Sequence, residues 1–527
     1  MLGEESIRTA VNHLVAFGDT DIFPALPELR FFGEKIDEVV KILSKLTPGD
    51  YIPSTAQEFL VPKSSNSFRI AHQLTSQDTL IYLASVLDNA EEIEGMRTPA
   101  DEGVAFSYRY LKGIGPKIFD PECSYHDWLE KITDFGGVIV PQNDKRVVVE
   151  TDISDFFQRI YFHRIENILD NCSKRHASSI TKKIVKTVRA NQSFGIPVGQ
   201  SASRMLAEAV LNDTDKFLLD QGLAVTRFVD DFRIIAEGEA EAHAALCQLA
   251  EHLMVTEGLS LNGAKTAFTS VGAMQDEAVR SLEDMSGSGD LRKMLRSIRV
   301  HYGDDLTDDD TEDDIAEFPF SDANDILEKM DKLEDEYPSD ISVYKAMLRA
   351  IKVMGGADPD HIMKYANRFF YIIPRDYCLA ISSSSTEDDS KVNKTRMKLL
   401  SYLKTSPYCD LEICRYWILS VFIKSNFNVS EKDFRGYDFN RSISERRCHH
   451  LLKAKLGDVS YFRQRKARFN DLSDWEKPAF MMGAMVLPRD EYEKWLTGIR
   501  SFSPGPLGGL YCDWLKEKWG SLPELLT

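Results

Sequence analysis

Two adjacent carboxylates inside an apolar stretch most restrict how this chain can fold. They are Asp230 and Asp231, in the segment TRFVDDFRII. Two like unit charges about 4 Å apart repel by roughly 4 kcal/mol at an effective dielectric constant near 20. The apolar runs on either side predict a β-hairpin with the doublet at or next to its turn. We therefore expect a positive group opposite the doublet.

A third carboxylate is expected beside this doublet. Asp152 follows three consecutive valines in RVVVETDISDFF, which predict a buried strand that ends near the aspartate. If that strand pairs with the hairpin, three carboxylates meet, and such a cluster requires a cation. Hard oxygen ligands suit Mg²⁺, and two ions about 4 Å apart favour phosphoryl or nucleotidyl transfer. The alternative is a surface turn with two solvated aspartates.

The composition is that of a globular protein, with 43% hydrophobic and 28% charged residues among 527. We expect about two to four domains. No apolar run reaches the roughly 18 to 20 residues of a membrane span, and the N-terminal segment has no secretory signal pattern, so we expect a cytoplasmic protein without a membrane partner. The net charge of −19 excludes a surface that coats nucleic acid everywhere, but it allows a local basic channel.

The sequence pattern changes near residue 285. Residues 1–285 mix strand-like runs with amphipathic segments, which predicts an α+β domain. Residues 321–527 carry apolar residues at helical spacing, which predicts an α-helical domain that could consist of stacked helix pairs. Residues 286–320 include DDLTDDDTEDD, in which eight of eleven residues are acidic. That block is typical of a solvated linker, and a gate that mimics nucleic acid is the alternative.

Two clusters in the helical part each have two interpretations. Cys409, Cys414, Cys448 and His449 could supply metal ligands, but their spacing matches no common zinc pattern, and buried small hydrophobic residues are the alternative. The stretch YFRQRKARF, Tyr461 to Phe469, interleaves positive charges with aromatic rings. It suits a phosphate backbone with stacked bases, and a solvated helix face explains it equally well.

Five short motifs follow one another in an order that resembles the reverse transcriptases. The segments TDISDFF, GIPVGQSAS, FVDD and LSLNGAKT resemble their palm motifs, and FLVPKSSNSFR resembles their fingers motif. The resemblance covers roughly residues 45–275. The segments GDTDIFP, FSYRY and VGQSASRMLAE bring it closest to the bacterial defence-associated, abortive-infection group typified by AbiK. The fold that the resemblance implies is a right-hand polymerase fingers and palm domain followed by a helical, HEAT-like C-terminal domain.

The resemblance assigns the carboxylates to catalysis. It implies that Asp152 and Asp230 bind two Mg²⁺ ions, with Asp231 as a weaker ligand or a structural support. It also implies that Lys265 lies near the triphosphate and can donate a proton to the leaving pyrophosphate. Phe228 stands where many of these enzymes have Tyr, which removes a hydroxyl and keeps the ring.

The resemblance also assigns residues to the nucleotide. Lys63 and Arg69 would bind the triphosphate, and ordinary surface bases are the alternative. Phe157 would exclude a 2′-hydroxyl, so the expected product is DNA; a core phenylalanine is the alternative. The usual PQG is PVG here, ending at Gly199, so the pocket amide is missing or has moved to Gln200. Template handling is therefore expected to differ.

The resemblance implies an antiphage defence DNA polymerase that uses dNTPs. Members of the resembled group extend DNA without an ordinary template, prime on a protein tyrosine and assemble as trimers or hexamers. Tyr51 and Tyr461 are candidate priming residues among 19 tyrosines. One alternative is an RNA-templated reverse transcriptase that uses a dedicated non-coding RNA. Another is a catalytically idle palm that binds nucleic acid as a sensor, although such a palm has no physical need for a repulsive carboxylate cluster.

Overall fold

The computed structural model describes residues 1–18, 20, 22–64, 66–125, 127–128, 145–274, 322–336, 341–384, 388–424 and 427–526. The chain folds into two compact units whose segments alternate along the sequence. Unit 1 consists of Met1–Ala16, Ser44–Ala56 and Asp78–Leu306, and unit 2 of Phe17–Leu43, Gln57–Gln77 and Thr307–Thr527. The N-terminal part of the chain thus contributes to both units. The domain boundaries at residues 285 and 320 fall outside the described residues and stay a prediction.

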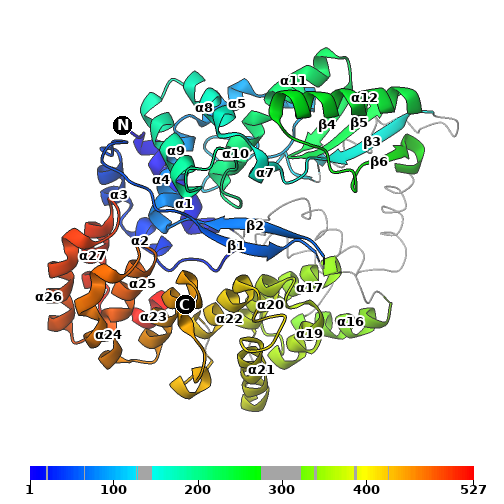
Figure 1. The fold of residues 1–527 in the computed structure, drawn as a ribbon. Helices are drawn as coiled ribbons and strands as arrows, with labels where there is room; N and C mark the ends of the chain where they lie inside the picture. The colour runs from blue at the N-terminus through cyan, green and yellow to red at the C-terminus, as the bar shows by residue number, and fades with distance from the viewer. Residues whose placement is uncertain are drawn as a thin grey trace. The chain divides into compact units, whose positions relative to one another are not determined.

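A four-stranded antiparallel sheet carries the predicted carboxylates of unit 1 (Figure 1). In the order β4-β5-β3-β6, it contains β3 (Val147–Asp152), β4 (Ala224–Phe228), β5 (Asp231–Ala236) and β6 (Ala267–Ser270). β4 and β5 form a hairpin in which Phe228 pairs with Asp231. β3 lies between β5 and β6, and its Val148 and Val149 are fully buried. Because consecutive residues of a strand point to opposite faces, both faces of β3 are covered here, and a strand covered on both faces has no polar alternation.

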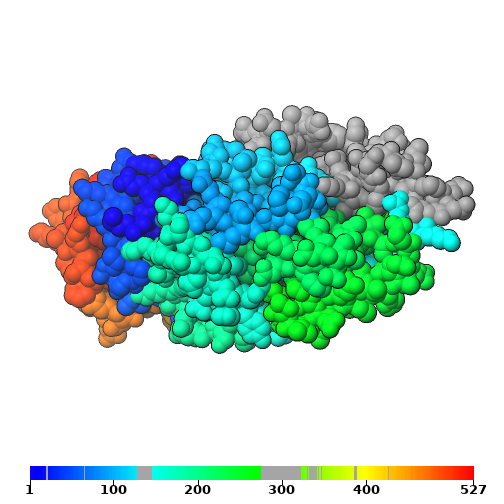
Figure 2. All heavy atoms as spheres, turned by 90° about the horizontal axis from the view of Figure 1, so that it is seen from above, coloured from blue at the N-terminus to red at the C-terminus, as the bar shows by residue number. Residues whose placement is uncertain are grey.

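Helices pack against the sheet of unit 1. α12 (Glu239–His252) contacts β3 and β5, and Figure 2 shows the green atoms of this part of the chain at the surface seen from above. The other helical segments of unit 1 are α1 (Glu4–Phe17), α4 (Ser76–Leu87), α5 (Ala90–Met96), η1 (Ala100–Glu102), α7 (Phe156–Arg159), α8 (Phe162–Asn171), α9 (Arg175–Val188), α10 (Ser201–Val210), α11 (Asn212–Asp220) and the π-helical turn η2 (Leu253–Glu257). α10 is buried on every side from Ala202 to Val210. Such burial explains why its one acidic residue needs buried partners.

Unit 2 contains a second hairpin, formed by β1 (Gln57–Pro62) and β2 (Phe68–Gln73). Phe59 of β1 is buried, and its ring stacks on Tyr416 with the centroids 5.8 Å apart. The ring of Phe23 also packs against Phe59, with the two centroids 4.7 Å apart. Tyr416 belongs to α22 (Glu412–Lys424), so this aromatic packing accounts for the grouping of the hairpin with the C-terminal helices.

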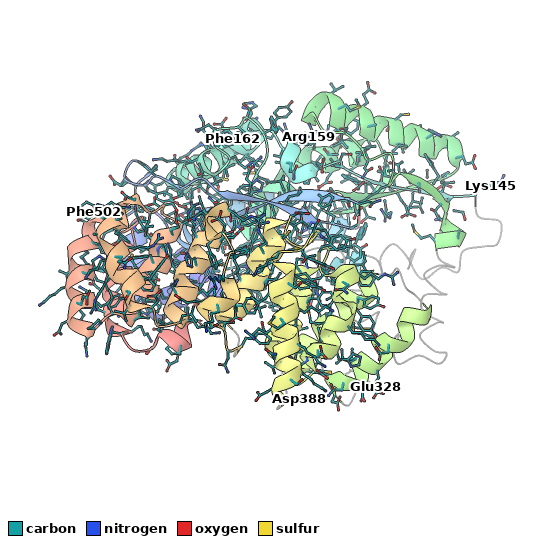
Figure 3. All side chains as sticks on the ribbon, turned by 60° about the horizontal axis from the view of Figure 1, so that its bottom comes forward. Lys145, Arg159, Phe162, Glu328, Asp388 and Phe502 are labelled. Carbon is teal, nitrogen blue, oxygen red and sulfur yellow. The ribbon has the colours of Figure 1, made fainter. Side chains whose placement is uncertain are left out.

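The rest of unit 2 is helical. Asp388 accepts a hydrogen bond from the backbone N–H of Ser390 and so caps α21, at whose end it is labelled in Figure 3. The helices are α2 (Leu29–Glu34), α3 (Ile36–Leu43), α16 (Ala323–Glu336), α17 (Ile341–Met354), α18 (Pro359–Ile362), η3 (Met363–Tyr365), α19 (Ala366–Phe369), α20 (Pro374–Ser383), α21 (Asp389–Tyr402), η4 (Glu431–Phe434), η5 (Phe439–Arg441), α23 (Ile443–Lys455), α24 (Val459–Arg465), η6 (Lys466–Asp471), α25 (Glu476–Gly483), η7 (Ala484–Val486), α26 (Arg489–Ile499), η8 (Arg500–Phe502), α27 (Gly508–Glu517) and α28 (Leu522–Leu526).

These elements confirm the predicted α+β class and the predicted helical C-terminal region. From residue 322 onward, the described residues form helices, turns and loops without a strand. Within the described part of the chain, no helix combines the length and the apolar character that crossing a membrane requires. The acidic segment 304–314 lies outside the described residues.

Candidate active site

The three predicted carboxylates lie at one end of the sheet of unit 1. Asp152 is the last residue of β3, and it pairs with Asp231, the first residue of β5. Asp230 precedes it in the turn, where its carbonyl oxygen accepts a hydrogen bond from Ile153 N at 3.1 Å. The antiparallel register therefore brings together two segments that are far apart in the sequence.

The carboxylates repel one another. Burial, followed by the charges of Asp231 and Asp152, raises the pKa of Asp230 to about 7. Burial also raises the pKa of Asp231, with Asp152 and Glu150 adding to the shift. Raised carboxyl pKa values mean that the ionised cluster is unfavourable without a cation. The repulsion expected within the doublet thus extends to all three side chains.

Lys265 supplies a positive group at this cluster. Its Nζ lies 2.6 Å from Asp152 Oδ2. Burial, the largest single influence, opposes the charge, but the hydrogen bond to Asp152 and the charges of Asp152, Asp231 and Asp230 together raise the pKa of Lys265. The turn that carries Lys265 is attached to the end of β3, because Asn262 N donates to the carbonyl oxygen of Asp152 at 2.8 Å. The Lys265 side chain is 63% exposed, so its ammonium can leave the carboxylate without crossing the core.

The donor chemistry of the cluster fits Mg²⁺. Asp152 Oδ1 is buried and has no hydrogen-bond partner within the described residues, which leaves one hard oxygen available for a cation. However, no three His, Cys, Asp or Glu side chains of the described residues are grouped closely enough to hold a metal ion by themselves. Mg²⁺ is commonly bound by one or two carboxylates, with waters and substrate phosphates completing its shell. The geometry therefore suits an ion that enters with a nucleotide better than a permanent metal site.

The turn before the doublet has an unusual backbone. Val229 has a φ of 53°, in the left-handed region that β-branched residues rarely adopt. Such a conformation costs on the order of 1–3 kcal/mol and persists only where the surroundings hold it. Val229 N donates to Ser107 Oγ at 2.7 Å, and the Val229 carbonyl oxygen accepts from Arg227 Nη1 at 3.0 Å. Both polar backbone atoms of the strained residue are therefore bonded to side chains.

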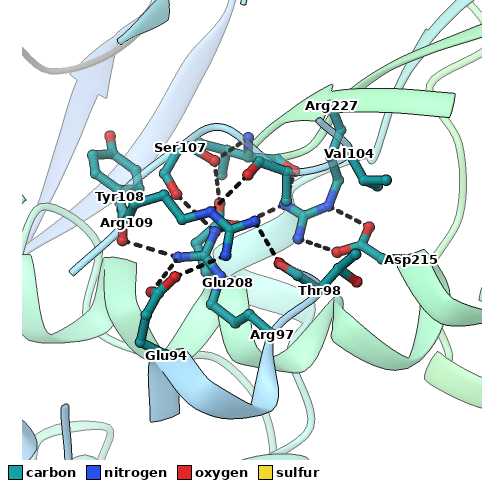
Figure 4. A network of polar contacts seen from close by, with 12 residues as sticks. Glu94, Arg97, Thr98, Val104, Ser107, Tyr108, Arg109, Glu208, Asp215 and Arg227 are labelled. Atoms are coloured by element: carbon teal, nitrogen blue, oxygen red, sulfur yellow. Dashed lines mark hydrogen bonds and ion pairs between the residues drawn. The ribbon is translucent and has the colours of Figure 1, made fainter. Parts of the chain in front are cut away.

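Those side chains belong to a buried network of charges (Figure 4). Glu208 of α10 accepts from Ser107 Oγ with one oxygen and from Arg97 and Arg227 with the other, both at 2.8 Å. Arg227 also bonds Asp215 of α11, with distances of 2.6 and 2.7 Å. Glu208 and Arg227 are fully buried. Removal of one partner of such a buried pair destabilises the fold strongly, because the other charge remains buried and unpaired.

These network residues were not predicted from the sequence. Ser107 and Glu208 lie in the quoted segments FSYRY and VGQSASRMLAE, and Arg227 lies two residues before Val229. The available signal in the sequence was Glu208 itself, an acidic residue with apolar neighbours in a helix. The network forms because segment 104–106 runs beside β4, where Phe106 N donates to the carbonyl oxygen of Arg227.

Comparison with known proteins identifies the domain type. Residues 104–304 match the family described as "Reverse transcriptase (RNA-dependent DNA polymerase)". The chain contains a reverse transcriptase domain. No curated protein matches the chain significantly. A domain of this type implies nucleotide polymerase activity and, in general, dependence on a divalent metal.

The similar solved structures include two telomerases of 10–11% sequence identity. One is telomerase from Candida albicans in complex with a fragment of telomeric RNA, which aligns over 79% of this chain and 70% of its own with a TM-score of 0.30. The other is apo telomerase from Candida tropicalis, with 74% of each chain covered and a TM-score of 0.31. TM-scores this low support no conclusion about the site. None of the comparisons identifies the abortive-infection group, which stays a prediction.

Three further predicted residues of the reverse transcriptase domain lie on short elements. Phe157 is half-buried in α7, directly after β3, whereas its neighbour Phe156 is the one in the core. Gly199 has a φ of 104°, which a side chain would make unfavourable. Gln200 is 1% exposed at the start of α10. Their roles toward a nucleotide stay predictions.

The predicted triphosphate ligands lie in unit 2. Lys63 is exposed just after β1, and its N–H donates to the carbonyl oxygen of Ser67 at the tip of the hairpin. Arg69 is half-buried on β2, in register with Val61. The two residues lie on one hairpin. Their role in binding a triphosphate stays a prediction.

The two candidate priming tyrosines are not exposed. Tyr51 is 2% exposed, and its hydroxyl donates to Asp78. Tyr461 is half-buried, and its hydroxyl lies 2.8 Å from His450 Nδ1. Both hydroxyls thus have a side-chain hydrogen-bond partner in the structure.

The two clusters of the helical region have structural roles here. Cys409, Cys414, Cys448 and His449 form no group that could hold a metal ion, a statement that covers the described residues. Cys414 and Cys448 are buried, as the alternative interpretation expected. The basic stretch 461–469 is partly neutralised, since Arg463 and Lys466 both pair with Glu491. This one carboxylate balances one of the four positive charges on which the interpretation as a nucleic-acid contact depends.

Proposed function

We propose that this protein is a DNA polymerase of the reverse transcriptase type that transfers nucleotides from dNTPs with two Mg²⁺ ions. The observation that carries the proposal is the meeting of Asp152, Asp230 and Asp231 at one end of the sheet, inside a reverse transcriptase domain. Three mutually repelling carboxylates are costly in an idle fold. Their repulsion supports catalysis over the idle sensor.

The carboxylates and Lys265 would have different roles in the reaction. Asp152 and Asp230 would hold the ions, and Asp231 would support them. When bound, Mg²⁺ lowers the barrier by activating the attacking hydroxyl and stabilising charge on the leaving pyrophosphate. Lys265 would leave Asp152, since the ammonium and a cation compete for one carboxylate, and would donate a proton to the pyrophosphate oxygen.

Other residues would select and orient the nucleotide. Lys63 and Arg69 would bind the triphosphate, because an ammonium and a planar guanidinium suit oxygens of high negative charge. The half-buried ring of Phe157 would exclude a 2′-hydroxyl, which makes DNA the expected product. The amide of Gln200 would take the place of the missing PQG glutamine, beside Gly199.

The proposed biological role is antiphage defence of the abortive-infection type, in the cytoplasm. The resemblance to the AbiK-like group supports protein-primed synthesis without an ordinary template, by a trimer or hexamer of this chain. The helical region from residue 322 onward is compatible with such an assembly surface. A dedicated non-coding RNA as template is the alternative that the experiment below separates.

Purified protein, Mg²⁺ and each labelled dNTP, with and without added RNA, test the proposal. The products are treated with protease before phenol extraction. DNA that forms without added template and leaves the protein phase only after digestion supports protein priming. Strict dependence on one RNA supports the templated alternative instead.

Two variants serve as control and test. Asp152→Asn keeps the shape of the side chain and removes a metal ligand, so incorporation should fall by at least about 100-fold. Asp220→Asn changes an exposed aspartate at the end of α11 and should leave incorporation at the wild-type level. If Asp152→Asn retained full synthesis and full phage protection, the polymerase proposal would be wrong.

A further inference from the structure

The strained residue Val229 is held from two sides by buried side chains. Ser107 accepts its N–H at 2.7 Å, and Arg227 donates to its carbonyl oxygen at 3.0 Å. Ser107 and Arg227 are fully buried, so water does not compete for these bonds. The residue next to Val229 is Asp230, and its own carbonyl oxygen is bonded to Ile153, directly after Asp152. The conformation of one peptide unit thus sets the separation of two carboxylates.

The charge of Glu208 fixes the direction of the serine bond. A hydroxyl has one proton to donate and lone pairs to accept with. Ser107 donates its proton to Glu208 Oε1, so its oxygen must act as the acceptor toward Val229 N–H. Arg97 and Arg227 both donate to Glu208 Oε2 at 2.8 Å, so the two oxygens of Glu208 accept from all three neighbours. Each hydrogen bond of the network therefore has a fixed donor and a fixed acceptor. Apolar side chains could not provide these bonds.

We infer that Ser107, Glu208 and Arg227 are positioning residues of the active site. They hold Val229 in its left-handed conformation and so place Asp230 close to Asp152. None of the three reaches the reacting atoms, and their effect passes through the backbone of the turn. The inference rests on the proposed polymerase function for its catalytic consequence, but the effect on the turn does not depend on it.

The test replaces Ser107 and compares it with a matched serine. Ser107→Ala removes the acceptor of Val229 N–H. Ser85→Ala is the control, because Ser85 is also fully buried in unit 1, donates to the carbonyl oxygen of Tyr82 and accepts from Thr181. A third protein combines Ser107→Ala with Val229→Gly, since glycine adopts positive φ without strain.

Two measurements, of hydrogen exchange and of incorporation kinetics, follow on each protein. Hydrogen exchange of a peptide covering residues 224–232 should be at least about 10-fold faster in Ser107→Ala and unchanged in Ser85→Ala. The kcat for dNTP incorporation should fall on the order of 100-fold in Ser107→Ala with little change in KM, as expected for misplaced catalytic groups. The double variant should regain at least about 10-fold of that kcat, because relief of strain replaces the lost acceptor.

The outcomes separate the inference from the proposed function. If wild-type protein incorporates no dNTP, the polymerase proposal fails, and the exchange measurement still decides whether the network holds the turn. If the turn exchanges no faster in Ser107→Ala than in Ser85→Ala, the inference is overturned. Loss of kcat that Val229→Gly does not restore also overturns it. If Ser107→Ala does not fold, Ser107→Cys, which keeps a weak donor and acceptor, should show the same changes at smaller size.

Discussion

Replacement of Lys265 by methionine should tighten the binding of a divalent ion to the protein without nucleotide. The ammonium lies 2.6 Å from Asp152 Oδ2, where it neutralises the carboxylate that an ion would need. An ion must displace this ammonium or bind in its positive field, and methionine removes both obstacles while it keeps most of the apolar stem. The prediction thus concerns the competition between Lys265 and the metal for one oxygen.

The size of the effect follows from the exposure of the ion pair. Two unit charges at hydrogen-bond distance would attract by several kcal/mol at an effective dielectric constant near 20. The Lys265 side chain is 63% exposed, so solvent screening reduces this to about 1 kcal/mol, the upper part of the range for surface pairs. A free energy of about 1 kcal/mol corresponds to roughly a fivefold lower Kd.

The assay is a titration with Mn²⁺, in which electron paramagnetic resonance counts the free ion at pH 7.5. Lys216→Met is the matched control, because Lys216 is exposed in the same unit and donates only to the carbonyl oxygen of Met96 among the contacts of the described residues. A Kd for Lys265→Met that equals or exceeds the wild-type value would refute the competition. Incorporation should fall in the same variant, since the proposed proton donor is gone.

Three further predictions concern charge, the buried network and nucleotide choice. Asp230→Asn should abolish incorporation and yet raise the free energy of unfolding by about 1–2 kcal/mol in EDTA, because it removes a repelled carboxylate. The pKa of Asp230 is raised to about 7, so between about pH 4 and 7 the folded wild type keeps a proton on this carboxyl group that the unfolded chain has lost. The free energy of unfolding of the wild type therefore falls as pH rises from about 4 to 7. In urea unfolding, the stability gained by Asp230→Asn over the wild type should be complete only above about pH 7. Arg227→Met should cost about 3–5 kcal/mol in thermal denaturation, as it leaves Asp215 buried without its partner and Glu208 with Arg97 as its remaining cation; a loss below about 1 kcal/mol would contradict this. Phe157→Ala should lower the preference for dNTPs over ribonucleotides at least about 10-fold in competition assays, whereas an unchanged ratio would assign the ring to packing.

The sequence predicts local structure where one pattern dominates a short segment. Three valines before Asp152 predict a buried strand, and the structure has β3 there, between two neighbours. The apolar runs around the doublet predict a hairpin, and β4 and β5 form it. Helical periodicity predicts the C-terminal region in the same way. Each of these results depends on neighbours within a few residues, for which periodicity is informative.

The sequence could not show how the motifs support one another. Glu208 lies among apolar neighbours in a buried helix, and Ser107 is an ordinary residue of a loop, so neither has a local pattern that indicates a partner. They meet because segment 104–106 runs beside β4, a contact between residues more than 100 positions apart. Likewise, the hairpin of residues 57–73 groups with the C-terminal helices through Phe59 and Tyr416, which no short-range rule predicts.

The amino-acid sequence by itself determined the strands, the helices, the acidic doublet and the family resemblance, because these depend on the order of nearby residues. Only the tertiary structure decided that Lys265 faces Asp152, that Val229 takes a left-handed conformation and that buried charges hold it there. A strained conformation persists only where the surrounding structure holds it, and here groups distant in the sequence do so. The local sequence therefore determines which chemical groups the doublet carries, but the geometry of the doublet depends on contacts that form only on folding.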